Sequence, residues 1–196
     1  MRTVNYLKRR PFDFWKLAAL AFCSYYLVRI AWEFAPGAPV NQAGSFAGMI
    51  FYNSSVLPHE FGHFLFARYG TLACVAGGTL LELFVPLFFI VYFFFTHRWF
   101  SAALAVSWLG ETVIFVAVYM ATAITQAGEY YLPGEGTVST ASYPGLVTDW
   151  NYLFTRLGLL PQTPLIAAAT YRLGFLLVLL GILLAFLNSR QSEADF

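Results

Sequence analysis

Long apolar runs alternate with short polar or Gly/Pro-rich stretches along most of the chain. About 20 residues at 1.5 Å each cross a hydrocarbon core of ~30 Å, so the longer runs predict membrane-spanning helices. The five predicted spans are residues 14–34, 46–69, 78–96, 99–124 and 164–188. The pattern therefore predicts an all-α, polytopic membrane protein that forms a single integral membrane domain over residues 1–196.

The segment 126–163 is the only long stretch that is not apolar, and it is rich in Gly, Pro and Ser. A loop of this length in a compact domain usually carries function. Within it, residues 148–154 (Thr-Asp-Trp-Asn-Tyr-Leu-Phe) predict a short helix capped by Thr148 or Asp149. We therefore interpret 126–163 as a functional loop that carries a short helix.

The composition agrees with a membrane protein, because 59% of the residues are hydrophobic, 11% are charged and the mean hydropathy is +0.65. A net charge of +1 leaves no basic face for phosphates, so nucleic acid is not an expected partner. Cys23 and Cys74 lie in apolar surroundings without C-x-x-C spacing, which is typical of small apolar thiols.

The first sixteen residues carry five cations, which place the N-terminus in the cytoplasm by the positive-inside rule. These cations are Arg2, Lys8, Arg9, Arg10 and Lys16. Alternating the five spans from there puts loops 69–77 and 126–163 on the cytoplasmic side and the C-terminus outside. The expected location is the plasma (inner) membrane if the source is bacterial.

One apolar run contains the sequence His59-Glu60-Phe61-Gly62-His63. Residues i and i+4 of a helix share one face, so His59 and His63 can bind one metal ion, and Glu60 can reach a water on it. This H-E-x-x-H pattern is that of zinc peptidases, with a carboxylate as general base. Ionisable residues inside apolar spans are expensive and therefore functional candidates. We expect Zn²⁺ as the cofactor and Glu60 as the catalytic residue.

A third protein ligand must come from elsewhere in the chain, and Asp149, Glu82 and Glu111 are the candidates. Asp149 ranks first because it shares the predicted cytoplasmic side with His63 and lies on a loop-borne helix. We expect Glu82 and Glu111, together with Asn53, to contact a ligand histidine or the substrate instead. His97 is a weaker option, because its turn is predicted on the opposite side.

The His-Glu-Phe-Gly-His motif, the following Gly77-Gly78 and the distant Asp149 resemble the site-2 protease family of intramembrane zinc metallopeptidases, in its small bacterial membrane form. The resemblance covers residues 53–78 and 148–154. It implies that His59, His63 and Asp149 bind zinc while Glu60 activates water. The Asn-Pro-Asp-Gly sequence usual around the acid is absent here, and Thr148 stands where the small forms have His.

The expected function is therefore hydrolysis of peptide bonds in or near transmembrane segments. The partners would be a membrane protein or peptide substrate and the lipid bilayer. One alternative is a zinc peptidase of the other H-E-x-x-H class, in which Glu111 is the third ligand. The others are a catalytically silent metal-binding membrane protein and, less in keeping with five spans without a repeat, a transporter.

Overall fold

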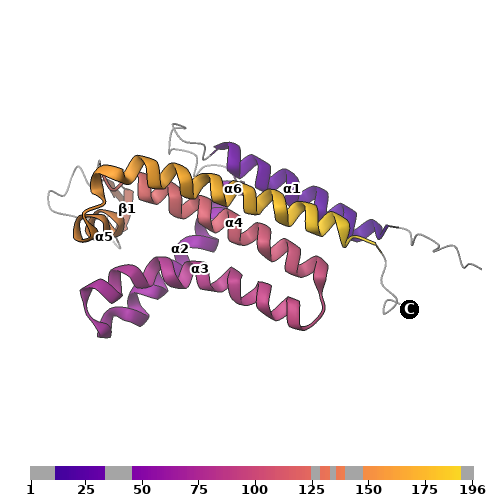
Figure 1. Ribbon diagram of the computed structural model, residues 1–196, viewed down its shortest axis with the longest axis horizontal. Coiled ribbons are helices and arrows are strands. Elements are labelled where there is room, and N and C mark those ends of the chain that lie inside the picture. The colour runs from indigo at the N-terminus through magenta and orange to yellow at the C-terminus, as the bar shows by residue number, and fades with distance from the viewer. Residues whose placement is uncertain (1–11, 34–45, 125–128, 133–135, 140–147, 191–196) are drawn as a thin grey trace, which may run out of the picture.

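The computed structural model describes residues 12–33, 46–124, 129–132, 136–139 and 148–190, without the side chains of 30–33, 46–53 and 129–139. Helices make up most of this part of the chain, as predicted (Figure 1). In chain order the elements are α1 (Phe14–Glu33), α2 (Phe46–Phe66), the 3₁₀-helix η1 (Ala67–Tyr69), α3 (Thr71–Phe95), α4 (Trp99–Ala121), β1 (Glu129–Leu132), β2 (Gly136–Ser139), α5 (Asp149–Leu157), the 3₁₀-helix η3 (Leu160–Gln162) and α6 (Thr163–Leu187).

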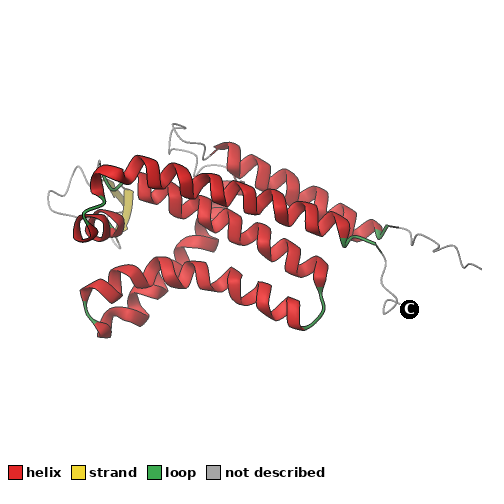
Figure 2. Cartoon of the chain, in the orientation of Figure 1, coloured by secondary structure: helices red, strands yellow, loops and turns green. Residues whose placement is uncertain are grey.

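The two strands form a short antiparallel hairpin inside the segment predicted to be a loop (Figure 2). Glu129 lies opposite Ser139 and Leu132 lies opposite Gly136. The sequence between these pairs includes tyrosine, valine and threonine, which fit strands well. The all-α prediction therefore missed this one element, because each strand is only four residues long.

Within the described residues, three helical segments are long and apolar enough to cross a membrane: α3, α4, and the continuous stretch Leu160–Leu187. Large apolar side chains such as Phe84, Phe88 and Leu180 are exposed on their outer faces. That surface suits lipid better than water. The structure thus supports membrane insertion through three segments and does not confirm all five predicted spans.

Helix α4 is the centre of the bundle and packs most closely on α6. A Cβ added at Gly174 would lie 2.7 Å from the carbonyl oxygen of Gly110, so the two backbones are almost in contact. Small residues allow such close approach between helices in membranes. Helix α1 covers this pair, with Leu20 beside Ala103 and Ala185.

The contacts also fix the helix directions. Leu27 of α1, farther along the helix than Leu20, packs against Ile114 and Val178, so α1 runs parallel to α4 and antiparallel to α6. The backbone N–H of Asp13 donates to the carbonyl of Ser189 at 2.9 Å, and Phe12 pairs with Arg190. We call the end of the bundle with Phe12, Arg98 and Arg190 the distal end, and the opposite end the α5 end.

This arrangement corrects the predicted alternation of spans. The beginning of α1 and the end of α6 lie at the same end of the bundle, whereas the sequence predicted opposite sides for them. The last turn of α1 points toward the α5 end, because α1 runs parallel to α4. The last turn of α2 points the same way, because η1 and the start of α3 follow it at that end. Alternation fails between these two helices, since packing of α1 on α4 and α6 sets its direction.

A second correction concerns Gly77 and Gly78, which were expected to open a span at residue 78. They lie inside α3, which begins at Thr71 directly after a tight turn at Gly70, whose φ of 97° suits glycine. A Cβ at Gly62 of α2 would lie 2.8 Å from the Cα of Gly78. The glycine pair therefore lets α2 and α3 pack backbone to backbone and does not mark a helix start.

Candidate metal centre

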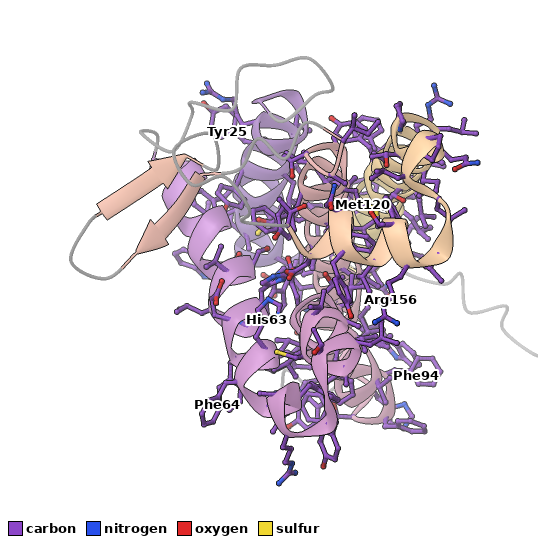
Figure 3. All side chains as sticks on the ribbon, turned by 90° about the vertical axis from the view of Figure 1, so that its left-hand side faces the viewer. Tyr25, His63, Phe64, Phe94, Met120 and Arg156 are labelled. Carbon is purple, nitrogen blue, oxygen red and sulfur yellow. The ribbon has the colours of Figure 1, made fainter. Side chains whose placement is uncertain are left out.

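His59 and His63 lie one turn apart on α2, and the side chain of His63 points into the interior of the bundle (Figure 3). Their Nε2 atoms are 3.0 Å apart, and their rings meet edge to face with centroids 4.7 Å apart. The exposed Phe64, the next residue along the helix, points outward. The i, i+4 spacing thus directs both imidazoles to one point, as expected for a helix.

Asp149 reaches the same point from α5. Its Oδ2 lies 3.0 Å from Nε2 of His59 and 3.1 Å from Nε2 of His63. The three side chains form a group that can hold a metal ion. The structure therefore joins Asp149 to the two histidines across 90 residues of sequence.

Helix α5 is firmly attached to the end of α4. Thr148 caps it by accepting a hydrogen bond from the backbone N–H of Asn151 at 3.1 Å, which decides between the two caps predicted. The side-chain amide of Asn151 donates to the carbonyl oxygen of Ala123 at 2.7 Å, beyond the last turn of α4. Phe154 is buried against Met120. These contacts, together with the cap by Thr148, set the position of Asp149 at the start of α5.

The outer nitrogens of both imidazoles have their own acceptors. Nδ1 of His63 lies 2.8 Å from the backbone carbonyl oxygen of Cys74, and a carbonyl can only accept, so this nitrogen carries a proton. Nδ1 of His59 lies 3.1 Å from Oε2 of Glu82, a carboxyl that is only 2% exposed. Such partners commonly orient metal-binding histidines and leave Nε2 free to bind the metal.

Three atoms that carry lone pairs therefore converge: the two Nε2 atoms and one carboxylate oxygen. Lone pairs on these atoms repel each other unless a proton or a metal ion lies between them. Ideal tetrahedral coordination at about 2.0–2.1 Å separates ligand atoms by about 3.4 Å. The observed separations of 3.0–3.1 Å are a few tenths shorter, so small outward shifts of the side chains would accommodate zinc.

Burial alone would raise the pKa of the Asp149 carboxyl, but hydrogen bonds to His59 and His63 outweigh this effect and lower it to about 2. Asp149 lies on α5, outside the segments that can cross a membrane. Its carboxylate is therefore charged at neutral pH, which is the form that binds metals.

Tyr119 of α4 is a further member of the site that the sequence did not single out. Its hydroxyl lies 3.3 Å from Oδ2 of Asp149, its oxygen is 3.4 Å from the Asp149 backbone nitrogen, and its ring meets that of His59 edge to face. A tyrosine near the end of an apolar run is also typical of the membrane interface, so nothing in the sequence marked it.

Gly78 provides the space for the two imidazoles. A Cβ at this position would lie 2.8 Å from Nε2 of His63 and 2.9 Å from Cε1 of His59. Any larger residue would displace both rings. Gly78 therefore has a steric role, because the absence of a side chain leaves room for the rings of His59 and His63.

The other predicted site residues lie around or away from this group. Glu60 is exposed on α2. Glu82 contacts His59, which is the contact expected of a residue that orients a ligand. Glu111 of α4 is 5% exposed and shares a hydrogen bond with Tyr26 of α1, and it is not part of the group that can hold a metal. The side chain of Asn53 lies outside the described residues.

His97 lies in the exposed turn between α3 and α4, at the distal end, with its ring against Trp99. The α5 end, where Asp149 and the N-terminal turns of α3 meet, is the other end of the bundle. The structure therefore separates His97 from the metal-binding group. The sequence predicted the same separation, because it placed the turn of His97 on the opposite side.

An apolar groove of about 450 Å³ runs along α2 and α3, close in sequence to Glu60. Its lining contains no charged residue: Leu57, Pro58, Phe61, Leu81, Phe84, Val85, Phe88 and Phe89. Pro58 and Phe61 flank the His59-Glu60 pair directly. The groove thus joins the H-E-x-x-H segment to an apolar surface.

No family model, curated protein or solved structure matches this chain.

Proposed function

We propose that this protein is a membrane-embedded zinc metalloprotease that hydrolyses peptide bonds in or near transmembrane segments. The observation that carries the proposal is the convergence of Nε2 of His59, Nε2 of His63 and Oδ2 of Asp149. Two imidazoles and one carboxylate leave a fourth position open, which is the ligand set of catalytic rather than closed structural zinc sites. The resemblance of residues 53–78 and 148–154 to site-2 proteases supports the same assignment.

Zinc in this centre would lower the pKa of a water molecule and polarise the substrate carbonyl. Glu60 follows His59 directly, and its exposed carboxylate accepts the proton of the attacking water and then delivers it to the leaving nitrogen. Glu82 and the Cys74 carbonyl hold the two imidazoles in the orientation that directs Nε2 inward. Glu60 is therefore the catalytic residue of the proposal, and Glu82 is a positioning residue.

The substrate would be an apolar peptide segment bound along the groove beside Pro58 and Phe61. A peptide bond inside a helix is hydrogen-bonded and shielded, so the segment must unwind locally before it is cleaved. The three apolar helical segments are compatible with insertion into a lipid bilayer, where such substrate segments are available. We propose the plasma (inner) membrane as its location if the source is bacterial.

Metal content tests the centre. Wild-type protein purified in detergent is expected to contain about one zinc per chain. His63→Ala and Asp149→Ala are each expected to lose it, because each removes a ligand. Glu111→Gln is the matched control and should retain zinc, since Glu111 lies beside Tyr26. Zinc loss in Glu111→Gln with retention in Asp149→Ala would favour the other H-E-x-x-H class of peptidase.

Cleavage tests the role of Glu60. The probes are casein and a tagged single-span membrane peptide, both in detergent. Glu60→Gln should abolish cleavage and keep the zinc, because the amide cannot accept the proton. Equal cleavage by Glu60→Gln and wild type would refute the role of Glu60.

A catalytically silent metal-binding protein is the second candidate. The observation that favours it is the exposure of Glu60, outside the hydrogen-bonded group around the histidines. In that case zinc would stabilise the fold without any cleavage of either probe by the wild type. Removal of the metal would then lower the melting temperature and change nothing else.

A further inference from the structure

The distribution of Lys and Arg between the two ends of the helix bundle points to an orientation in the membrane. Cytoplasmic loops and tails close to membrane spans carry an excess of these residues, and acidic residues contribute little. The helix directions established by packing now allow each cation of the described residues to be assigned to an end of the bundle. The sequence analysis assumed that all spans alternate, whereas α1 and α2 both end toward the α5 end.

Among the described residues three cations lie at the distal end, and four more precede Phe12 in the sequence. The three are Lys16 in the first turn of α1, Arg98 in the turn before α4, and Arg190 after α6. Lys16 donates to the carbonyl of Arg190 at 3.5 Å, so the two lie together. The other four precede Phe12 by no more than ten residues: Arg2, Lys8, Arg9 and Arg10.

The remaining four cations lie on the side of the α5 end. Arg68 follows α2 in η1, Arg156 is in the last turn of α5, Arg29 is in the later half of α1, and Arg172 is in the first half of α6. The same end holds the metal-binding group, because Asp149 begins α5 and Cys74 lies in the first turns of α3. The cations therefore mark the end opposite to the candidate centre.

We propose that the distal end is cytoplasmic and that the metal centre faces the opposite, extracytoplasmic side of the membrane. Both metal ions and cleavable segments would then reach His59, His63 and Asp149 from outside the cell. This inference rests on the proposed function only in naming zinc and a peptide segment as what the centre binds. The orientation itself rests on the three apolar segments, the helix directions and the charges.

Cysteine labelling tests the orientation in a bacterial expression host. The background carries Cys23→Ala and Cys74→Ala, which keeps the Cys74 carbonyl that accepts from His63. Thr155→Cys reports on the α5 end and Thr96→Cys on the distal end, and both threonines are exposed. A membrane-impermeant maleimide is applied to intact and to permeabilised cells, and permeabilised cells confirm that each cysteine can react.

The proposal requires labelling of Thr155→Cys in intact cells and loss of labelling of Thr96→Cys until the cells are permeabilised. The reverse pattern overturns it, and so does equal labelling of both variants in intact cells. Replacing Lys8, Arg9 and Arg10 with Gln should make Thr96→Cys partly reactive in intact cells, because the cations that hold this end inside are removed. Unchanged labelling there would refute the role of the charges.

Zinc content of the same cysteine variants separates this inference from the proposed function. Variants that bind zinc and show reversed labelling overturn the orientation and leave the metal centre intact. Variants with the expected labelling and no zinc support the orientation and overturn the proposed function.

Discussion

The hydroxyl of Tyr119 and Oδ2 of Asp149 are 3.3 Å apart, and this is the same carboxylate oxygen that meets both histidines. Tyr119 also lies 3.4 Å from the backbone nitrogen of Asp149, so it touches this residue at two points. The end of α4 thus holds the carboxylate in place through one phenol group.

Tyr119→Phe is expected to keep the fold and to weaken zinc binding by about tenfold, because partners of metal ligands typically contribute 10- to 100-fold to affinity. Competition with a chelator measures the affinity. Tyr92→Phe is the control, since Tyr92 is an exposed tyrosine of α3. Equal affinities in the two variants would show that the phenol does not position Asp149.

Glu82→Gln and Glu82→Ala should form a graded pair. The amide of Gln can still accept the proton of His59 Nδ1, so we expect a loss of zinc affinity of about tenfold, and a greater loss in Ala, where no acceptor remains. Glu111→Gln replaces the carboxyl of another buried glutamate by an amide and should leave the zinc affinity unchanged. Similar losses in Glu82→Gln and Glu111→Gln would point to a general effect of replacing a buried carboxyl.

Gly78→Ala tests the space that the imidazoles occupy. The new Cβ would press on both rings at 2.8–2.9 Å, so zinc content should fall although no ligand has changed. Gly174→Ala is the matched control, because its Cβ would meet Gly110 and Ile114 between α4 and α6. We expect it to lower the melting temperature without selective loss of zinc. The same loss of zinc in both would indicate that packing alone is responsible.

Asn151→Ala removes the amide that joins α5 to the carbonyl of Ala123. Leaving this carbonyl without its partner should cost about 1–3 kcal/mol of stability and weaken zinc binding, since Asp149 begins the same helix. Thermal unfolding and chelator competition measure the two effects. Asn188→Ala breaks a similar bond to Leu184 at the distal end and should affect stability only. An unchanged zinc affinity in Asn151→Ala would show that Asp149 is held by other contacts.

Local spacing accounts for what the sequence predicted well. The i, i+4 spacing brings His59 and His63 together, and the cap of α5 follows from Thr148 and its neighbours. Asp149 was ranked first among the acids, and the structure places it with the histidines, while the role of ligand stays a prediction. The prediction of its side of the membrane rested on an alternation that the packing does not follow.

Tertiary contacts account for what the sequence missed. The acceptor for His63 is a backbone carbonyl at Cys74, and every residue type carries that group, so no sequence pattern can identify it. Tyr119 enters the site only because α5 packs on the end of α4. The glycine pair was expected to begin the span 78–96, whereas its actual role depends on Gly62 of the neighbouring helix.

The contacts of the centre also imply an order in which it assembles. His59, His63 and their acceptors at Cys74 and Glu82 are all within a hairpin of two adjacent helices, with separations of 4, 11 and 23 residues. Asp149 joins them only across 90 residues. Short-range contacts form sooner than long-range ones, because less chain entropy is lost in closing the loop. A nascent chain would thus present two oriented imidazoles before its carboxylate arrives, and an early metal ion could be captured there and then enclosed.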